Sequence, residues 1–108
     1  MATNMTIYHG KRALGVGTVP GPVTVTNDEG TRPLTPRWNW CGFNWGYFGS
    51  GPRHLAYALL ADVTGNDVLA DKYCSAFRDD VVSCLSNDWQ PSAEMVRNWC
   101  REAEEVSS

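Results

Sequence analysis

One nearly uncharged apolar segment constrains this chain more than any other feature of its sequence. Within residues 55–63 only Tyr57 and Asp62 carry a polar side-chain atom. A helix that is apolar on nearly every side must be buried, so this segment is predicted to form the central helix of the core. Gly65 follows it closely and suits the left-handed position at which many helices end.

A glycine-rich junction precedes this helix. Ser50 is predicted to be the N-cap, because its hydroxyl can accept a hydrogen bond from an N–H group of the first turn. Pro52 would then lie in that turn, where its missing N–H group costs nothing. The junction could also hold a small anion against the helix N-terminus. This anion-binding alternative would use Gly49, Ser50, Gly51 and Arg53, although Pro52 replaces the lysine of the P-loop pattern.

Short strands are predicted before the junction. Val23–Thr26 alternates apolar and hydroxyl side chains with the period of a half-buried strand. Pro33 restricts its own segment to a sheet edge, because it has no N–H group to donate. The predicted extended segments are 6–9, 23–26 and 31–34, separated by a turn or strand edge at 10–12, a loop at 13–22 and a turn at 27–30.

Two further helices are predicted after the central one. The second begins with Asn66 as its cap and continues to about Leu85. Its apolar positions have helical spacing and are Leu69, Tyr73, Phe77, Val81 and Cys84. After a break at residues 87–88, Ser92 is predicted to cap a third helix that ends near Glu105. The buried face of this third helix is predicted to hold Val96, Trp99, Cys100 and Ala103.

The order of these elements predicts an α+β fold. Strands and helices occupy separate parts of the chain, which disfavours a doubly wound parallel sheet. At 108 residues the chain can bury a core without metal or disulfide support. We expect a single domain over 1–108, with a small antiparallel β-meander at 1–34, an aromatic and glycine-rich loop at 35–51, and a three-helix unit with a buried central helix at 52–106.

The loop before the central helix has an unusual composition. Residues 35–50 contain six aromatic side chains and one charged residue. Such a segment must bury much of its surface, so it is predicted to seal the top of the core. The alternative is a binding surface, because Trp is enriched among the residues that dominate protein interfaces. In that alternative Trp38 and Trp40 are the apolar anchors.

Charge is divided unevenly along the chain. Residues 1–54 hold five Lys or Arg and two acids, whereas residues 55–108 hold four basic residues and ten acids. The two halves therefore carry +3 and −6, which sum to the net charge of −3. An acidic helical half argues against direct nucleic-acid binding and suits a basic partner. The acids predicted to contact such a partner are Asp67, Asp71, Asp79, Asp80 and Asp88; the alternative is a solvated helix face that keeps the protein soluble.

No catalytic or metal-binding set emerges from the remaining residues. The four cysteines include no C-x₂-C pair, and they are predicted to be reduced thiols. Two histidines, His9 and His54, are too few for a histidine-rich metal site. Ser50 and His54 lack both a G-x-S-x-G pattern and an acid placed by sequence. We therefore expect no enzyme activity and no cofactor, and with no apolar span or secretory signal we expect a cytoplasmic protein.

Several motifs resemble a family of short proteins known only as domain of unknown function number 6166. They are Trp45-Gly-Tyr, Gly49-Ser-Gly-Pro, the Leu/Ala helix through Asp62, the aromatic pair Tyr73 and Phe77, the late tryptophans Trp89 and Trp99, and Arg32-Pro-Leu-x-Pro. The resemblance covers most of residues 6–100. It implies a small stand-alone protein of bacteria, archaea or their viruses, and it supplies no mechanism because the family has no assigned activity. Arg53, His54 and Cys100 depart from the family pattern.

These observations lead to two functional hypotheses. The first is a non-enzymatic protein that occupies a surface of a larger protein partner, in its most specific form a phage or mobile-element protein that inhibits a host defence complex as anti-CRISPR proteins do. The second is a module that binds a small anion or nucleotide at the Gly-Ser-Gly-Pro helix N-terminus. No membrane partner is expected, and dimerisation is left open.

Overall fold

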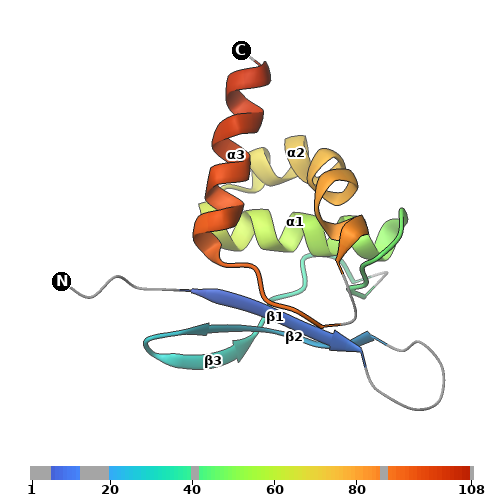
Figure 1. The fold of residues 1–108 in the computed structure, drawn as a ribbon, viewed down its shortest axis with the longest axis vertical. Coiled ribbons are helices and arrows are strands. Elements are labelled where there is room, and N and C mark those ends of the chain that lie inside the picture. Colours follow the sequence, from blue (N-terminus) through green and yellow to red (C-terminus); the bar gives the residue numbers. More distant parts are fainter. Residues whose placement is uncertain (1–5, 13–19, 40–41, 86–87, 108) are drawn as a thin grey trace.

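The structure, a computed structural model, describes residues 6–12, 20–39, 42–85 and 88–107. It consists of an antiparallel sheet covered on one face by three helices (Figure 1). The predicted α+β class is confirmed, with three strands before the helices and one short strand between the second and third helices.

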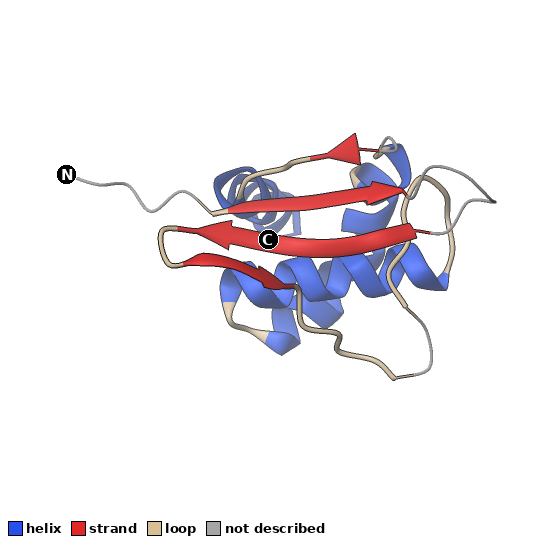
Figure 2. Cartoon of the chain, turned by 90° about the horizontal axis from the view of Figure 1, so that it is seen from below, coloured by secondary structure: helices blue, strands red, loops and turns tan. Residues whose placement is uncertain are grey.

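Four strands form the sheet in the order β3-β2-β1-β4. They are β1 (Ile7–Arg12), β2 (Pro20–Asn27), β3 (Gly30–Pro33) and β4 (Asp88–Trp89). The edge position predicted for the segment containing Pro33 is confirmed. Figure 2 shows the uncovered face of the sheet, with the helices behind it.

The sequence prediction missed part of this sheet. Gly10–Arg12 continues β1 instead of turning, because Gly10 pairs with Val23 on one side and with Trp89 on the other. Strand β2 also begins at Pro20, within the segment predicted to be a loop. The two-residue strand β4 lies where the prediction placed only a chain break. All three differences come from pairing with distant residues, which local composition does not report.

Side chains alternate across the sheet as the period of a strand requires. Tyr8, Val23 and Val25 are buried beneath the helices, whereas His9 and Thr24 are only half-buried on the other face. The inward residues form one core with α1 (Ser50–Thr64).

Helix α1 is the buried central helix that the sequence predicts. Leu55, Leu59 and Leu60 are all 0% exposed. Gly65 ends the helix with φ 67°, and its N–H group donates to the carbonyl oxygen of Ala61 at 2.8 Å. This left-handed cap is confirmed.

The predicted N-cap of α1 is wrong. Gly49 occupies the N-cap position with extended backbone and no capping side chain, and Ser50 is the first helical residue. The ring of Tyr47 explains the glycine, because a Cβ at position 49 would lie 2.6 Å from Tyr47 Cε2. The Tyr47 ring therefore packs directly over the start of the helix.

The second helix, α2 (Asp67–Asp80), is shorter than predicted. Asn66 caps it by accepting from the N–H group of Leu69 at 3.1 Å, as expected. However, the chain leaves the helix after Asp80 and enters a short 3₁₀ turn, η1 (Val82–Cys84). Val82 is buried there and its carbonyl accepts from Gly46 N–H at 2.9 Å, so the contact with the aromatic loop ends the helix early. Cys84 is consequently exposed and not on the predicted apolar stripe.

The third helix, α3 (Ala93–Ser107), rises from the sheet and continues past α2 (Figure 1). Ser92 Oγ accepts from Met95 N–H at 3.1 Å, which confirms the predicted cap. Val96 and Cys100 are buried, and Trp99 and Ala103 are half-buried. The projecting end carries Val106, whose side chain is 87% exposed.

Candidate functional site

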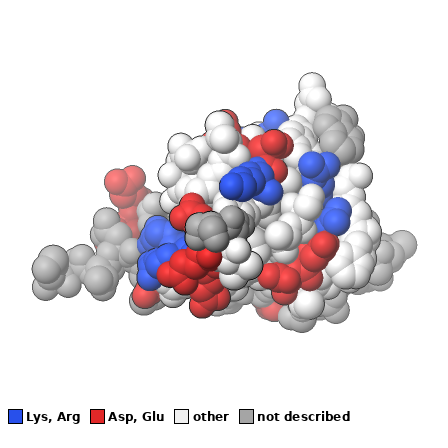
Figure 3. Space-filling view, turned by 90° about the horizontal axis from the view of Figure 1, so that it is seen from above, with Lys and Arg blue, Asp and Glu red and all other residues white. Residues whose placement is uncertain are grey.

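The five predicted acids do not lie together. Asp67 and Asp80 are at opposite ends of α2, about 20 Å apart at 1.5 Å per residue. Asp88 lies in β4, in the other layer of the molecule. Seen from above (Figure 3), acidic and basic side chains are interspersed over the helical layer.

Several of these acids already have partners within the chain. The contacts are Arg37 Nη1 to Asp67 Oδ1 at 3.6 Å, Arg78 Nε to Asp79 Oδ1 at 2.9 Å, Trp99 Nε1 to Asp80 Oδ2 at 3.1 Å and His9 Nε2 to Asp88 Oδ1 at 2.8 Å. Asp71 is exposed on α2. A partner would thus meet alternating charges on most of this surface.

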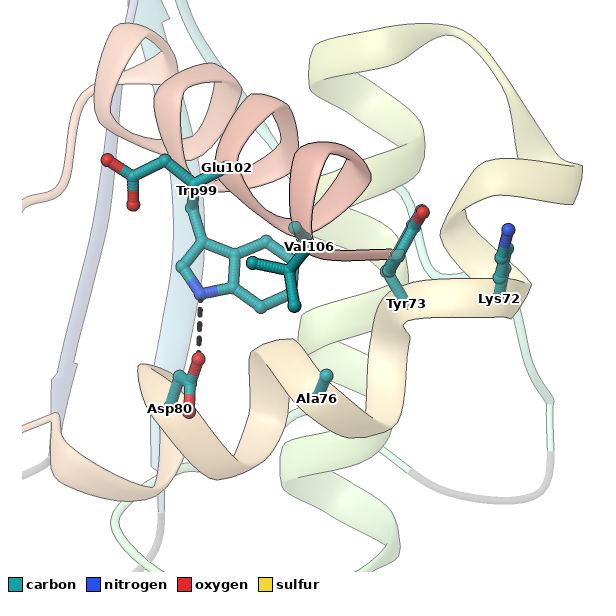
Figure 4. A pocket seen from close by; sticks show the side chains of 8 residues that line it. Lys72, Tyr73, Ala76, Asp80, Trp99, Glu102 and Val106 are labelled. Carbon is teal, nitrogen blue, oxygen red and sulfur yellow. Dashed lines mark hydrogen bonds between the residues drawn. The ribbon is translucent and has the colours of Figure 1, made fainter. Parts of the chain in front are cut away.

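A groove of about 510 Å³ opens between α2 and α3 (Figure 4). Its lining is mainly apolar in the middle and charged at the rims. The residues are Lys72, Tyr73, Ala76 and Asp80 from α2 and Trp99, Glu102, Ala103 and Val106 from α3. Of the predicted partner-binding residues, only Asp80 lines it.

Trp99 forms the floor of this groove and is held from three sides. Its ring makes edge-to-face contacts with Phe77 at 4.9 Å and with Tyr73 at 6.3 Å between centroids. Its indole N–H donates to Asp80 (Figure 4). The sequence predicts Trp99 as a core residue, yet the ring also contributes to an accessible surface. A fixed aromatic ring of this kind suits a binding anchor, because little conformational entropy is lost on contact.

The rest of the groove was missed by sequence reasoning. The missing signal is in α3, where Trp99, Ala103 and Val106 have helical spacing and Val106 extends the apolar stripe past the predicted helix end. Lys72 and Glu102 could be predicted to be exposed, but not to flank an apolar groove, since that depends on how α3 packs against α2.

The aromatic loop mainly seals the core. Trp38 stacks on His54 with centroids 4.9 Å apart and an interplanar angle of 14°, and the Arg53 guanidinium carbon lies 5.7 Å from the Trp38 ring centroid. Trp38 is accordingly half-buried. Trp40, the other predicted anchor, lies outside the described residues. The most exposed aromatic side chain of the described loop is Phe48, at 68%.

His54 organises this loop from inside the core. It is 0% exposed, and its Nε2 accepts two hydrogen bonds, from Arg37 N–H at 2.9 Å and from Trp38 N–H at 3.0 Å. A ring nitrogen that accepts carries no proton, so the structure implies a neutral imidazole with its proton on Nδ1. Sequence reasoning considered His54 only as a metal ligand or base and missed this role.

The residues predicted for anion binding meet at the start of α1. The space beside Gly51 is filled by the loop, because a Cβ there would lie 2.8 Å from Asn44 Cβ and 3.4 Å from the Tyr47 hydroxyl. Gly49 is extended and Ser50 opens the helix, while the Arg53 guanidinium lies over Trp38. Anion binding here stays a prediction, which a thermal-shift series with phosphate and nucleotides would test.

Asp62 joins the helix layer to the sheet. The Tyr8 hydroxyl donates to its Oδ2 at 2.6 Å, and Arg32 Nη2 lies 2.9 Å from its Oδ1. Strands β1 and β3 thus bring two side-chain donors to this carboxylate at the end of α1. Burial raises the pKa of Tyr8, and its hydrogen bond to Asp62 raises that pKa further.

This raised pKa predicts a stability that falls at alkaline pH. An unfolded tyrosine ionises near pH 10, whereas folded Tyr8 holds its proton, so its contribution is complete below about pH 10 and is lost as the pH rises above it. Above about pH 10, we expect Tyr8 to lower the free energy of unfolding by about 1.4 kcal/mol for each further pH unit. Tyr8→Phe should be less stable than the wild type at pH 8, but its free energy of unfolding should fall less than that of the wild type between pH 9 and 11. Urea unfolding measures both quantities.

Tyr47→Phe is the matched control, since the Tyr47 side chain is 45% exposed. It should retain the wild-type dependence on pH. If Tyr8→Phe also retains that dependence, the alkaline transition arises elsewhere in the chain.

The described residues also address the expectations about metal ions and thiols. No group of three or more His, Cys, Asp or Glu side chains there could hold a metal ion. Cys74, Cys84 and Cys100 are free thiols, and burial raises the pKa of Cys100. His54 Nε2 already accepts hydrogen bonds from the backbone N–H groups of Arg37 and Trp38. Among the described helices, none is long and apolar enough to cross a membrane.

Comparison with known protein families identifies a match. A family described as "Family of unknown function (DUF6166)" matches residues 8–102. No curated protein matches the chain, and no solved structure does.

Proposed function

The chain belongs to this family of unknown function, and we propose that it is a non-enzymatic interaction protein that binds a protein partner through the groove between α2 and α3. The observation that carries the proposal is the combination of a fixed aromatic floor with charged rims. Trp99 supplies that floor, and Asp80 and Glu102 supply acids beside it.

The projecting end of α3 adds support. Val106 is a large apolar residue that is 87% exposed and lines the groove. Scattered exposed apolar residues are ordinary, but one that extends an apolar groove is typical of a surface that a partner covers. Aromatic side chains in such positions often supply most of the binding energy.

The rim charges favour a partner with a basic residue next to an apolar one. Asp80 and Glu102 both line the groove. Asp80 uses Oδ2 to accept from Trp99, and a carboxylate can accept further hydrogen bonds through its other oxygen. Charged rims raise the rate and specificity of association more than the affinity, so the apolar floor should carry the affinity.

The most specific form of the proposal is an inhibitor of a host defence complex. Support comes from the setting that the family resemblance implies and from the acids at the groove, which could meet a surface that normally binds nucleic acid. An assay of target-DNA cleavage by such a complex, with and without the protein, tests this form. Unchanged cleavage would remove it and leave partner binding to be tested separately.

Filling the groove tests the proposed site. Ala76 is exposed and lines the groove, so Ala76→Arg should fold normally. Because its side chain would occupy the groove beside Trp99, we expect capture of the partner from host lysate to fall at least about tenfold, which corresponds to about 1.4 kcal/mol. Capture is quantified by mass spectrometry against the wild-type protein.

Ser75→Arg is the control. It places the same charge on the neighbouring exposed residue of α2, outside the groove. This variant should capture the partner as the wild type does. Equal capture by Ala76→Arg and the wild type would show that the partner binds elsewhere.

A further inference from the structure

The walls of the groove have the length of two helical turns. From Lys72 to Asp80 the α2 wall spans about 12 Å, and from Trp99 to Val106 the α3 wall spans about 10 Å, at 1.5 Å per residue. Both walls present residues spaced three or four apart, which form the ridges of a helix surface. Ala76 and Ala103, one from each helix, are small and leave room for another backbone to approach.

The hydrogen-bonding needs of the occupant's backbone indicate which conformation it adopts in the groove. An extended segment would bring unpaired N–H and C=O groups against an apolar lining, and burying such groups without partners costs free energy. A strand could pair them only with a sheet edge, and the walls of this groove are both helical. The exposed edge strand β3 lies in the other layer (Figure 1). A helix, in contrast, pairs its backbone groups internally.

The charges at the groove give the occupant a direction. Asp80 and Glu102 lie toward one end and Lys72 lies toward the other (Figure 4). A helix carries partial positive charge at its amino end and partial negative charge at its carboxyl end. The favourable orientation therefore places the amino end beside Asp80 and Glu102 and the carboxyl end beside Lys72.

We infer that the groove takes two turns of an amphipathic helix from a protein partner, bound with its amino end and basic residues beside Asp80 and Glu102. The inference rests on the proposed function and adds the conformation and direction of the partner. Apolar side chains at i, i+3, i+4 and i+7 of the bound helix contact Trp99, Tyr73 and Val106.

Two synthetic peptides test the direction. Each has about twelve residues, a hydrocarbon staple that holds it helical, and leucines at i, i+3, i+4 and i+7. The first carries lysines in its opening turn and glutamates in its last turn; the second has these charges exchanged. We expect the first to bind about five- to tenfold more tightly by fluorescence polarisation, because each surface charge pair contributes about 0.2–1 kcal/mol.

A spin label on the amino end of the first peptide gives an independent reading of direction. It should broaden the backbone amide signals of Asp80 and Glu102 more than that of Lys72 in NMR spectra of the protein. Ala76→Arg should weaken binding of the peptide, and Ser75→Arg should not. An unstapled peptide of the same composition with central prolines should bind more weakly than either helix.

The outcomes separate this inference from the proposed function. Equal affinity of the two stapled peptides, stronger broadening at Lys72, no binding of either peptide, or equal binding of the proline peptide would each overturn the helical inference. Partner capture by Ala76→Arg is measured without these peptides. Loss of that capture would keep the proposed site even where the peptide result contradicts a helix.

Discussion

Replacing His54 by alanine is expected to lower the free energy of unfolding by about 3 kcal/mol or more. His54 is completely buried, and its Nε2 is the acceptor for two backbone N–H groups, those of Arg37 and Trp38. Leaving a buried donor without a partner costs about 1–3 kcal/mol. The substitution also removes the ring on which Trp38 stacks, which leaves a cavity in the core. Urea unfolding followed by circular dichroism measures the change.

The conservative variant His54→Gln separates the acceptor from the ring. The side-chain oxygen of glutamine lies about as far from the backbone as Nε2 of histidine and can accept a hydrogen bond from an N–H group. This variant should therefore recover part of the lost stability. Hydrogen exchange gives the local reading. Amide protection of Arg37 and Trp38 should disappear in His54→Ala and persist in His54→Gln. If those amides stay protected in His54→Ala, His54 does not hold the loop in place.

This role of His54 shows where sequence reasoning stops. The residue lies in a helix whose burial could be predicted from apolar composition, and that prediction is correct. The partners of its ring are backbone groups some sixteen residues earlier in a loop without regular structure. No pattern of residue types indicates such a contact, because every residue except proline carries the same backbone N–H donor.

Features determined by local chemistry were predicted well. Asn66, Ser92 and Gly65 all take the capping positions expected of them, since each cap depends on neighbouring residues alone. The Ser50 cap was not found, because the helix begins one residue earlier than predicted and Gly49, packed against the nearby Tyr47 ring, takes the N-cap position.

The candidate site depends on tertiary geometry still more strongly. The acidic charge of the second half of the chain led to the prediction that five acids contact a partner. The fold, however, separates Asp67 from Asp80 along α2 and places Asp88 in the sheet. Only the packing of α3 against α2 brings Asp80 next to Trp99 and an apolar groove. Composition indicated the sign of the charge and the aromatic residue type, whereas the structure selects which acid and which tryptophan lie together.

The contact between Gly10 and Trp89 leads to the second large effect on stability. A Cβ at position 10 would lie 2.3 Å from Trp89 Cζ2 and 2.5 Å from Trp89 Cε2, closer than two carbon atoms that are not bonded can approach. The indole cannot easily move, because it is 5% exposed and its ring packs edge-on against Trp45 at 5.3 Å. Gly10→Ala should therefore lower the free energy of unfolding by about 2–3 kcal/mol, measured by urea unfolding.

The matched control for this substitution is Gly42→Ala, where a new Cβ meets no atom within 4 Å. That variant should stay within about 0.5 kcal/mol of the wild type, as surface substitutions usually do. The near-ultraviolet circular dichroism of Gly10→Ala should also change, because displacing Trp89 alters its contact with Trp45. Wild-type stability and spectrum in Gly10→Ala would mean that the indole has another position available. In that case β4 would be held by its backbone pairing with β1, and the register of Gly10 opposite Trp89 would not require glycine.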